Sequence, residues 1–238
     1  MNRGVFITGT DTDIGKTVVT AGLVASLRQN GYDMGVMKPF QSGAPEVEGK
    51  LLAPDIDFVL EMTDLEADYD LINPIRLKPP LAPSIAAEVE GVEVDINDVK
   101  LAYQELQKQF EGLIVEGAGG LIVPLAEDFL VPDLVKMLEL PIIIVARPNL
   151  GTINHTVLTV KVARQLGLEV LGVIINGLKA DEMGTAEETN PEIISKLGDV
   201  PILGIIPYIE GLDGSAEQVN LGRIIKESVD VDYIVNSL

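Results

Sequence analysis

The chain has no cysteine and a single histidine among its 238 residues. Without cysteine there are no disulfides, thiolate zinc sites, iron–sulfur clusters or cysteine nucleophiles. The lone His155 excludes a metal site built from several histidines, and no serine–histidine–aspartate triad is evident. The absence of cysteine fits a reducing compartment. Any chemistry must therefore depend on other side chains.

Basic residues are scarce: 17 Lys and Arg stand against 37 Asp and Glu, which gives a formal net charge of −20. Proteins that bind DNA or RNA neutralise phosphates with Lys and Arg, so a surface this acidic would repel a polyanion. An anionic membrane surface is disfavoured for the same reason. Because 47% of the residues are hydrophobic, the chain can bury enough apolar surface to fold, which excludes disorder.

Long hydrophobic runs are also missing. The longest apolar run, residues 141–146, has the length of a strand and is too short to span a bilayer. The first residues lead directly into a strand pattern, which leaves no room for the apolar core of a signal peptide. We therefore expect a soluble, cytoplasmic protein that has neither nucleic acid nor membrane as a partner.

Short β-branched runs alternate with stretches of helical periodicity along most of the chain. The runs expected to be strands are residues 3–8, 33–38, 112–116, 140–146, 169–175 and 200–205. The stretches expected to be helices are residues 15–29, 130–139, 153–166, 191–197 and 219–235. The strand runs are almost continuously apolar, as in parallel strands covered on both faces. The pattern predicts an α/β fold with a doubly wound, mostly parallel sheet flanked by helices, in a single domain over residues 1–238.

The stretch from residue 43 to residue 108 departs from this alternation. Its residues 46–70 hold nine acidic side chains and one basic side chain, Lys50. Residues 55–62 and 95–110 have helical patterns, and the prolines between them indicate a rigid crossing. These prolines are Pro74, Pro79, Pro80 and Pro83. We expect a solvated acidic insertion on one face, with a few of its carboxylates near a site.

A glycine-rich loop joins the first predicted strand to the first predicted helix. Its sequence is GTDTDIGKT at residues 9–17, so the glycines of a phosphate-binding loop are followed by Lys16 and Thr17. In such loops the backbone N–H groups and the helix N-terminus bind phosphate, the lysine reaches the β- and γ-phosphates, and the threonine holds Mg²⁺. The spacing is Gly-x₅-Gly-Lys-Thr, one residue longer than the usual motif. It predicts a Mg-nucleotide site, with ATP the favoured nucleotide, in a fold like that of the P-loop NTPases.

Two acidic residues, Asp11 and Asp13, lie inside this phosphate loop. They either accept hydrogen bonds from loop amides, or face a cationic substrate group, or simply tolerate the turn conformation. Many partition and cell-division switch ATPases carry a second lysine four residues before the last glycine of the loop. In this chain that position is Asp11, which argues against such a switch.

Polar residues follow the other predicted strands, where ligands bind in open α/β sheets. Lys38 is placed to neutralise a phosphoryl group in transfer, and Glu116, followed by glycines, suits a Mg²⁺ ligand. Residues 151–154 can open a helix with free N–H groups and so bind a carboxylate. Asn176 has an amide that can read an adenine edge, and His155 is interpreted as structural or orienting.

Together these motifs resemble the dethiobiotin synthetase family. The resemblance rests on GTDTDIGKT at 9–17, KPFQSG at 38–43, VEGAGGLIVPL at 115–125, LGTINHT at 150–156 and Asn176-Gly177. It implies that 7,8-diaminopelargonate reacts with CO₂ (from bicarbonate) and MgATP to give dethiobiotin, ADP and phosphate, in biotin biosynthesis. One amine forms a carbamate, the carbamate attacks the γ-phosphorus, and the second amine displaces phosphate from the carbamic-phosphoric anhydride.

The resemblance also implies a role for individual residues. Lys16 and Lys38 are the expected catalytic residues, and Thr17, Asp55 and Glu116 the expected Mg²⁺ ligands. The nucleotide is expected to contact Asp13, Ile14, Gly15, Lys16, Thr17, Val18, Asn176 and Pro207. The substrate is expected to contact Thr12, Ser42, Gly119, Gly151, Thr152, Ile153 and Asn154. In this family the last four come from the other subunit of a homodimer.

Two assignments stay open at this point. The metal-binding aspartate after the second strand is Asp55 or Asp57, and Asp55 is favoured because it follows Pro54 at the expected helix start. The family often has Glu where this chain has Asp13, whose reach is shorter. Two rivals remain: a synthetase of the cobyrinate amidase type, which needs a glutaminase domain with a catalytic cysteine, and a dimeric switch ATPase. The chain lacks both the cysteine and the second loop lysine.

Overall fold

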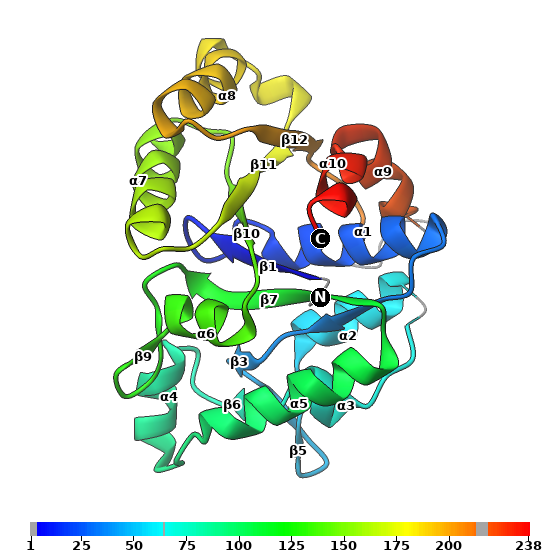
Figure 1. Cartoon of the computed structure of the whole chain (residues 1–238), viewed down its shortest axis with the longest axis vertical. Helices are drawn as coiled ribbons and strands as arrows, with labels where there is room; N and C mark the ends of the chain where they lie inside the picture. The colour runs from blue at the N-terminus through cyan, green and yellow to red at the C-terminus, as the bar shows by residue number, and fades with distance from the viewer. Residues whose placement is uncertain (1–3, 64, 213–218) are drawn as a thin grey trace.

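The computed structural model describes residues 4–63, 65–212 and 219–238, and these contain a central sheet of six parallel strands. The strand order is β12-β11-β10-β1-β7-β2, and Figure 1 shows the labelled strands descending in this order from β12. The strands are β1 (Gly4–Gly9), β2 (Met34–Met37), β7 (Gly112–Gly120), β10 (Ile142–Ala146), β11 (Val170–Leu178) and β12 (Ile202–Pro207). The predicted α/β fold with a parallel sheet is confirmed.

Apolar packing on both faces holds this sheet together. β1 and β10 are buried along their whole length, and Phe6 stands in register with Ile142 on one side and Val115 on the other. Because helices cover both faces, alternate positions along a strand are equally shielded from water. This burial explains why the strand sequences are apolar without alternation.

The helices form two layers (Figure 1). In one layer α1 (Lys16–Gln29) packs on β1, β2 and β7, and against it pack α2 (Pro54–Thr63), α9 (Leu221–Ser228) and α10 (Val231–Asn236). The other layer contains α5 (Ile96–Gln109), α6 (Val131–Leu138), α7 (Thr152–Gln165) and α8 (Thr185–Gly198), which contact β7, β10, β11 and β12.

The chain reverses direction across the sheet beside β1. The connection through α1 runs from β1 towards β2, whereas the connections through α6 and α7 run the opposite way, from β7 to β10 and from β10 to β11. Right-handed crossovers in opposite directions place their helices on opposite faces. In doubly wound sheets the ligand crevice lies beyond the strand ends at this reversal. The carboxyl end of β1 is therefore the place to look for a site.

The predicted acidic insertion is more regular than its prolines suggest. Its helices at 55–62 and 95–110 are confirmed as α2 and α5. The predicted crossing between them contains regular elements that the sequence did not predict: α3 (Tyr69–Ile72), β6 (Ile75–Leu77), which pairs with β3 (Phe40–Ser42), and α4 (Pro83–Glu90). Pro83 occupies the first turn of α4, where the missing N–H costs no hydrogen bond. The remaining short elements are two antiparallel pairs and a 3₁₀ turn: β4 (Glu46–Val47) with β5 (Lys50–Leu51), β8 (Pro124–Ala126) with β9 (Phe129–Leu130), and Ala180–Glu182.

The single helix predicted over residues 219–235 is wrong, since α9 and α10 are separated by an extended segment at Val229. There Val229 bridges to Gly204 in β12, and the Asp230 N–H donates to the Leu203 carbonyl at 2.7 Å. A Cβ at Gly204 would lie 2.3 Å from the backbone oxygen of Ser228, so the close approach requires glycine. This long-range pairing outweighs the local helical pattern.

Other boundaries also differ from the prediction. The helix expected at 191–197 begins earlier, at Thr185, and Pro191 lies inside it. β7 continues to Gly120 and β11 to Leu178, so Glu116 and Asn176 lie within these strands and not at their ends. The glycines after Glu116 stay in the strand because Gly120 pairs with Gly9 of β1.

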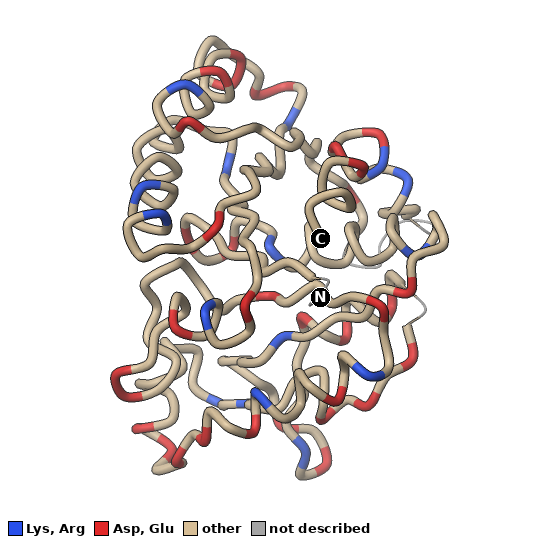
Figure 2. The backbone as a smooth tube through the Cα atoms, in the orientation of Figure 1, with Lys and Arg blue, Asp and Glu red and all other residues tan. Residues whose placement is uncertain are grey.

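The acidic residues are distributed over the helices and loops around the sheet (Figure 2). Among the described residues, none of the helices combines the length and apolar character needed to cross a membrane.

Candidate active site

The loop after β1 has the backbone of a phosphate cradle. Thr10 is anchored through its N–H to the Val145 carbonyl at 3.0 Å, and Lys16 begins α1. Asp13 and Gly15 both take positive φ angles, 56° and 86°. Alternating left-handed residues in a loop turn successive N–H groups to one side, which makes a concavity for anions. This loop adjoins the N-terminus of the 14-residue helix α1, whose dipole favours negative charge.

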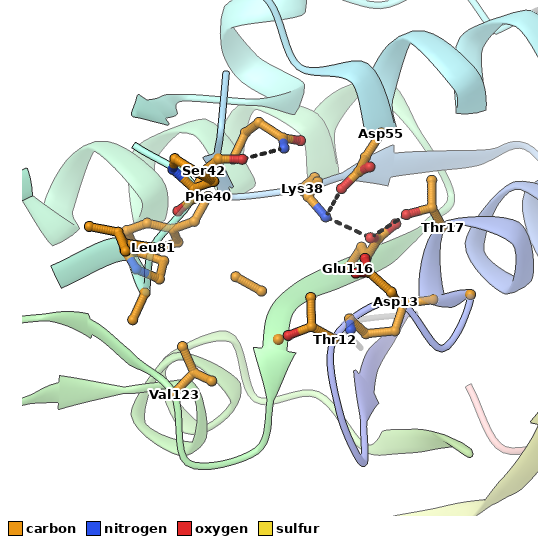
Figure 3. Close-up of a pocket in the computed structure, with 18 residues that line it drawn as sticks. Thr12, Asp13, Thr17, Lys38, Phe40, Ser42, Asp55, Leu81, Glu116 and Val123 are labelled. Atoms are coloured by element: carbon orange, nitrogen blue, oxygen red, sulfur yellow. Dashed lines mark hydrogen bonds and ion pairs between the residues drawn. The ribbon is translucent and has the colours of Figure 1, made fainter. Parts of the chain in front are cut away.

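A cavity of about 800 Å³ opens beside this loop. Its lining includes ten residues that the sequence predicted to lie in the site: Thr12, Asp13, Gly15, Lys16, Thr17, Lys38, Ser42, Asp55, Glu116 and Gly119. Figure 3 shows the charged side chains Lys38, Asp55 and Glu116 gathered at one end, with Phe40 and Leu81 at the other. The cavity therefore has a polar end and an apolar end.

Lys38 links two carboxylates at the polar end. Its Nζ lies 2.6 Å from Glu116 Oε1 and 2.5 Å from Asp55 Oδ2, and the Thr17 hydroxyl donates to the same Glu116 oxygen at 2.8 Å. The side chains of Lys38 and Glu116 are only 6% and 1% exposed, whereas that of Asp55 is 35% exposed. Lys38 therefore shares its single charge between two carboxylates, one of them fully buried.

The two lysines have opposite pKa shifts. Burial lowers the pKa of Lys16, and the attraction of Glu116 offsets only part of this effect. Burial acts on Lys38 in the same sense, but Glu116 and Asp55 outweigh it and raise the Lys38 pKa above its ordinary value. The raised pKa keeps the Lys38 ammonium charged at neutral pH, whereas an anionic ligand beside Lys16 would offset the effect of burial on that lysine. Its Nζ meanwhile donates to the Asp11 carbonyl at 3.0 Å.

The donor set at this end fits Mg²⁺. Glu116 Oε2 is buried and has no hydrogen-bond partner among the described residues, so one carboxylate oxygen is left to bind a cation. Hydroxyl and carboxylate oxygens are the ligands that Mg²⁺ takes, usually one or two from the protein and the rest from phosphates and water. Consistent with this, the described residues contain no cluster of three or more His, Asp or Glu side chains that could hold a metal alone.

Asp55 and Asp57, the two candidate metal-binding aspartates, lie in different surroundings. Asp55 lines the cavity and contacts Lys38, whereas Asp57 accepts a hydrogen bond from the Tyr69 hydroxyl at 2.9 Å and does not line the cavity. The two residues are both in the first turn of α2 and project in different directions from it.

The two loop aspartates also differ. Asp11 Oδ1 accepts the Thr12 N–H at 2.8 Å, as expected of a residue that binds loop amides, and its other oxygen pairs with Arg147 at 2.7 Å. Asp13 adopts the left-handed conformation, which Asp tolerates better than most residues. Both carboxylate oxygens of Asp11 therefore have partners within its own chain.

Several residues predicted for the site lie away from the cavity. Ile14 is in the hydrophobic core, and Val18, in α1, does not line the cavity. Asn176 contacts the loop from β11, and Pro207 ends β12. The segment Gly151, Thr152, Ile153 and Asn154 forms the start of α7 and contributes nothing to the cavity in this chain. His155 is exposed on the same helix.

The sequence motifs did not point to the three apolar residues of the cavity or to Asn73. The apolar end is lined by Phe40, Leu81 and Val123, of which Phe40 lies within the quoted KPFQSG motif and Val123 within VEGAGGLIVPL. Asn73 is fully buried, and its Nδ2 donates to the Lys38 carbonyl at 2.5 Å. Asn73 comes directly after α3, and no motif in the sequence links it to Lys38.

Several known proteins are similar to this chain in sequence. A family model described as an AAA domain matches residues 3–216. The ATP-dependent dethiobiotin synthetase of Bacillus velezensis is 44% identical, over 98% of this chain and 97% of that protein. The enzymes so named from Bacillus subtilis (strain 168) and Methanococcus vannielii are 42% and 45% identical, over 99% and 85% of this chain and 99% and 92% of their own lengths.

Solved structures show the fold. The MinC:MinD cell division complex of Aquifex aeolicus matches with a TM-score of 0.57 and 16% identity, over 99% of this chain and 93% of that one. A ParA family ATPase from Chlorobium tepidum matches with a TM-score of 0.57 and 15% identity, over 100% and 98%. At these identities the similarity shows the P-loop NTPase fold alone.

The relatives cover nearly the whole chain, and their identity extends well beyond the phosphate loop. The cavity beside the glycine loop is lined by two lysines and by the hydroxyl and carboxylate oxygens of Thr17 and Glu116. The chain belongs to the ATP-dependent dethiobiotin synthetase family.

Proposed function

We propose that this chain, folded as one domain, converts 7,8-diaminopelargonate, CO₂ and ATP into dethiobiotin, ADP and phosphate. One amine adds to CO₂ and loses a proton, giving a carbamate. A carbamate oxygen attacks the γ-phosphorus of ATP and ADP leaves. The second amine then attacks the carbamate carbon and loses a proton, and the C–O bond to phosphate breaks as the ureido ring closes. The observation that carries this proposal is the buried Lys38, held beside the phosphate loop in a cavity with an apolar far end.

Lys16 and Lys38 are the residues proposed to act on the phosphoryl group. Lys16 starts α1 and lies in the cavity, where it reaches the terminal phosphates of a nucleotide bound by the loop. Lys38 approaches from the opposite wall and neutralises the charge shared by carbamate and γ-phosphate. Because the site is largely shielded from water, each positive charge counts for more than it would in bulk solvent.

Thr17, Asp55 and Glu116 are the residues proposed to hold Mg²⁺. When bound there, Mg²⁺ would supply positive charge to offset the negative charge of the phosphoryl group in transfer. The chain's part is to keep the ligands in place: α1 presents the Thr17 hydroxyl, β7 presents Glu116, and α2 presents Asp55.

The apolar end suits the hydrocarbon chain of diaminopelargonate. Phe40, Leu81 and Val123 provide the apolar walls. Thr12, Ser42 and Gly119, which also line the cavity, are proposed to contact the diamine, and Figure 3 shows Ser42 beside Phe40. Ser42 Oγ is buried without a hydrogen-bond partner among the described residues, so it is available to the amine or the carbamate.

Two further parts of the proposal concern groups outside the cavity. Gly151, Thr152, Ile153 and Asn154 open a 14-residue helix, and we assign them to the substrate carboxylate of a second copy in a homodimer. The nucleotide base is assigned to Asn176 and Pro207, and its phosphates to residues 13–18.

The test of the overall reaction is direct. The purified protein, incubated with diaminopelargonate, bicarbonate and MgATP, is expected to form dethiobiotin, detected by mass, with one ADP per ring closed. ATP turnover that does not depend on diaminopelargonate, with no ring product, would contradict the proposal.

Asn73→Ala is expected to slow this reaction although Asn73 is not in the cavity. The substitution leaves the buried Lys38 carbonyl without its donor, so the free energy of unfolding should fall by about 1–3 kcal/mol. Asn190→Ala is the matched control, because buried Asn190 donates to the Pro148 carbonyl at 2.7 Å in the same way. Both variants should lose similar stability in urea denaturation, and only Asn73→Ala should lose turnover. Equal turnover in the two variants would remove Asn73 from the support of Lys38.

A further inference from the structure

Asn176 ties the phosphate loop to the far side of the sheet. It lies in β11, and its Nδ2 donates to the Ile14 carbonyl at 3.0 Å, although the two residues are 162 apart in sequence. We infer that Asn176 is a positioning residue for the phosphate end of the nucleotide. This inference deepens the proposed function, which assigns Asn176 to the base, and it rests on the proposal that the loop binds phosphate.

The hydrogen bond controls the direction of a loop N–H. Across a trans peptide the C=O and the following N–H point in opposite directions. With the Ile14 carbonyl held on Asn176, the N–H of Gly15 points the opposite way within the same peptide plane. Gly15 lines the cavity, so the residue that Asn176 orients through this peptide is one of those that meet the ligand.

Close packing reinforces the hydrogen bond. Gly15 has φ +86° and is the N-cap of α1, with no side-chain cap. A Cβ at this position would lie 2.0 Å from Asn176 Nδ2 and 3.1 Å from its Cγ. The side-chain amide therefore lies directly against the backbone of Gly15 and leaves no room for a side chain there.

The rest of the loop is anchored on the same side. Ile14 puts its side chain into the core beneath Gly9, where a Cβ would lie 2.5 Å from Ile14 Cδ1. Thr10 is bound to Val145, and Asp11 to Arg147, both from the end of β10. Asn176 supplies the remaining contact, next to the helix N-terminus where the phosphates are proposed to bind.

A ligand without a base separates this role from base recognition. We propose to measure the binding of inorganic tripolyphosphate with Mg²⁺, and of MgATP, to the full chain by calorimetry. The test variant is Asn176→Asp, which keeps the shape against Gly15 but replaces the donor by an acceptor facing the Ile14 carbonyl. Asn176→Ala is the second variant, in case the carboxylate perturbs folding. Asn190→Ala controls for the loss of a buried asparagine elsewhere.

Both Asn176 variants are expected to bind tripolyphosphate roughly tenfold more weakly than the unsubstituted chain, in proportion to one lost hydrogen bond. Asn190→Ala should bind it normally. If the variants lose affinity for MgATP and bind tripolyphosphate as before, Asn176 acts on the base alone and the inference is overturned. If the unsubstituted chain binds neither ligand, the proposed phosphate loop itself is wrong, and this result is distinct from the former.

Discussion

Lys38→Met is expected to lower the turnover of dethiobiotin formation by roughly 10²–10³-fold while the fold is retained. The substitution replaces lysine by an unbranched apolar side chain one atom shorter and removes the ammonium between Asp55 and Glu116. Stopped assays of product by mass give the rate, and circular dichroism checks the fold. A variant with a near-normal rate would remove Lys38 from the mechanism.

The same variant is expected to bind a divalent cation better in the absence of nucleotide. In the unsubstituted chain the Lys38 ammonium occupies the carboxylates that we assign to Mg²⁺. Its removal leaves two uncompensated carboxylates, which should lower the free energy of unfolding by about 3 kcal/mol. Added Mg²⁺ should then restore much of that loss by binding the folded state. Thermal melts against Mg²⁺ concentration measure this, and an equal response in both proteins would contradict the proposed competition.

Glu116→Gln is expected to have the second large effect. The amide preserves the shape of a fully buried side chain but removes the charge that faces Thr17 and Lys38. We expect the affinity for Mn²⁺ in the presence of ADP to fall by at least ~10-fold. Removing a residue that only supports a metal ligand already lowers metal affinity about 10–100-fold, and removing a ligand itself should cost more. Electron paramagnetic resonance of free Mn²⁺ gives the affinity.

The two aspartates of α2 provide a matched pair for this measurement. Asp55→Asn should weaken Mn²⁺ binding, because Asp55 lines the cavity. Asp57→Asn should not, because that carboxylate accepts a hydrogen bond from Tyr69 and does not line the cavity. The reverse order would mean that the metal site is formed by Asp57, and that the position of α2 differs when nucleotide is bound.

The sequence predicted those parts of the structure that depend on local patterns. The parallel strands are apolar along their length, and the glycine loop with Lys16 and Thr17 has a spacing that a reader can recognise without knowing the fold. Lys38 follows its strand directly and was predicted for the same reason. The family resemblance supplied the roles, and the relatives confirm the family.

The parts that escaped prediction depend on contacts between distant residues. Asn73 and Lys38 lie 35 residues apart, and only the folded chain places the amide of one on the carbonyl of the other. The split of the last helix at Val229 depends on its bridge to Gly204, a strand residue that the helical pattern of residues 219–235 does not contain. The sequence predicts Glu116 at a strand end, because the glycines after it resemble a loop. In the structure Gly120 continues the pairing with β1, so Glu116 lies inside the strand.

If a carbamate oxygen attacks the γ-phosphorus beside Lys16 and Lys38, as we propose, one oxygen atom of CO₂ must pass to the phosphate. The reaction is run with ¹⁸O-labelled bicarbonate in ordinary water and stopped within seconds, before the label exchanges with solvent. The oxygen that bridges carbon and phosphorus leaves with the phosphate when the ring closes. We expect one labelled oxygen in the phosphate for each dethiobiotin formed from fully labelled CO₂. Dethiobiotin formed together with unlabelled phosphate would contradict it.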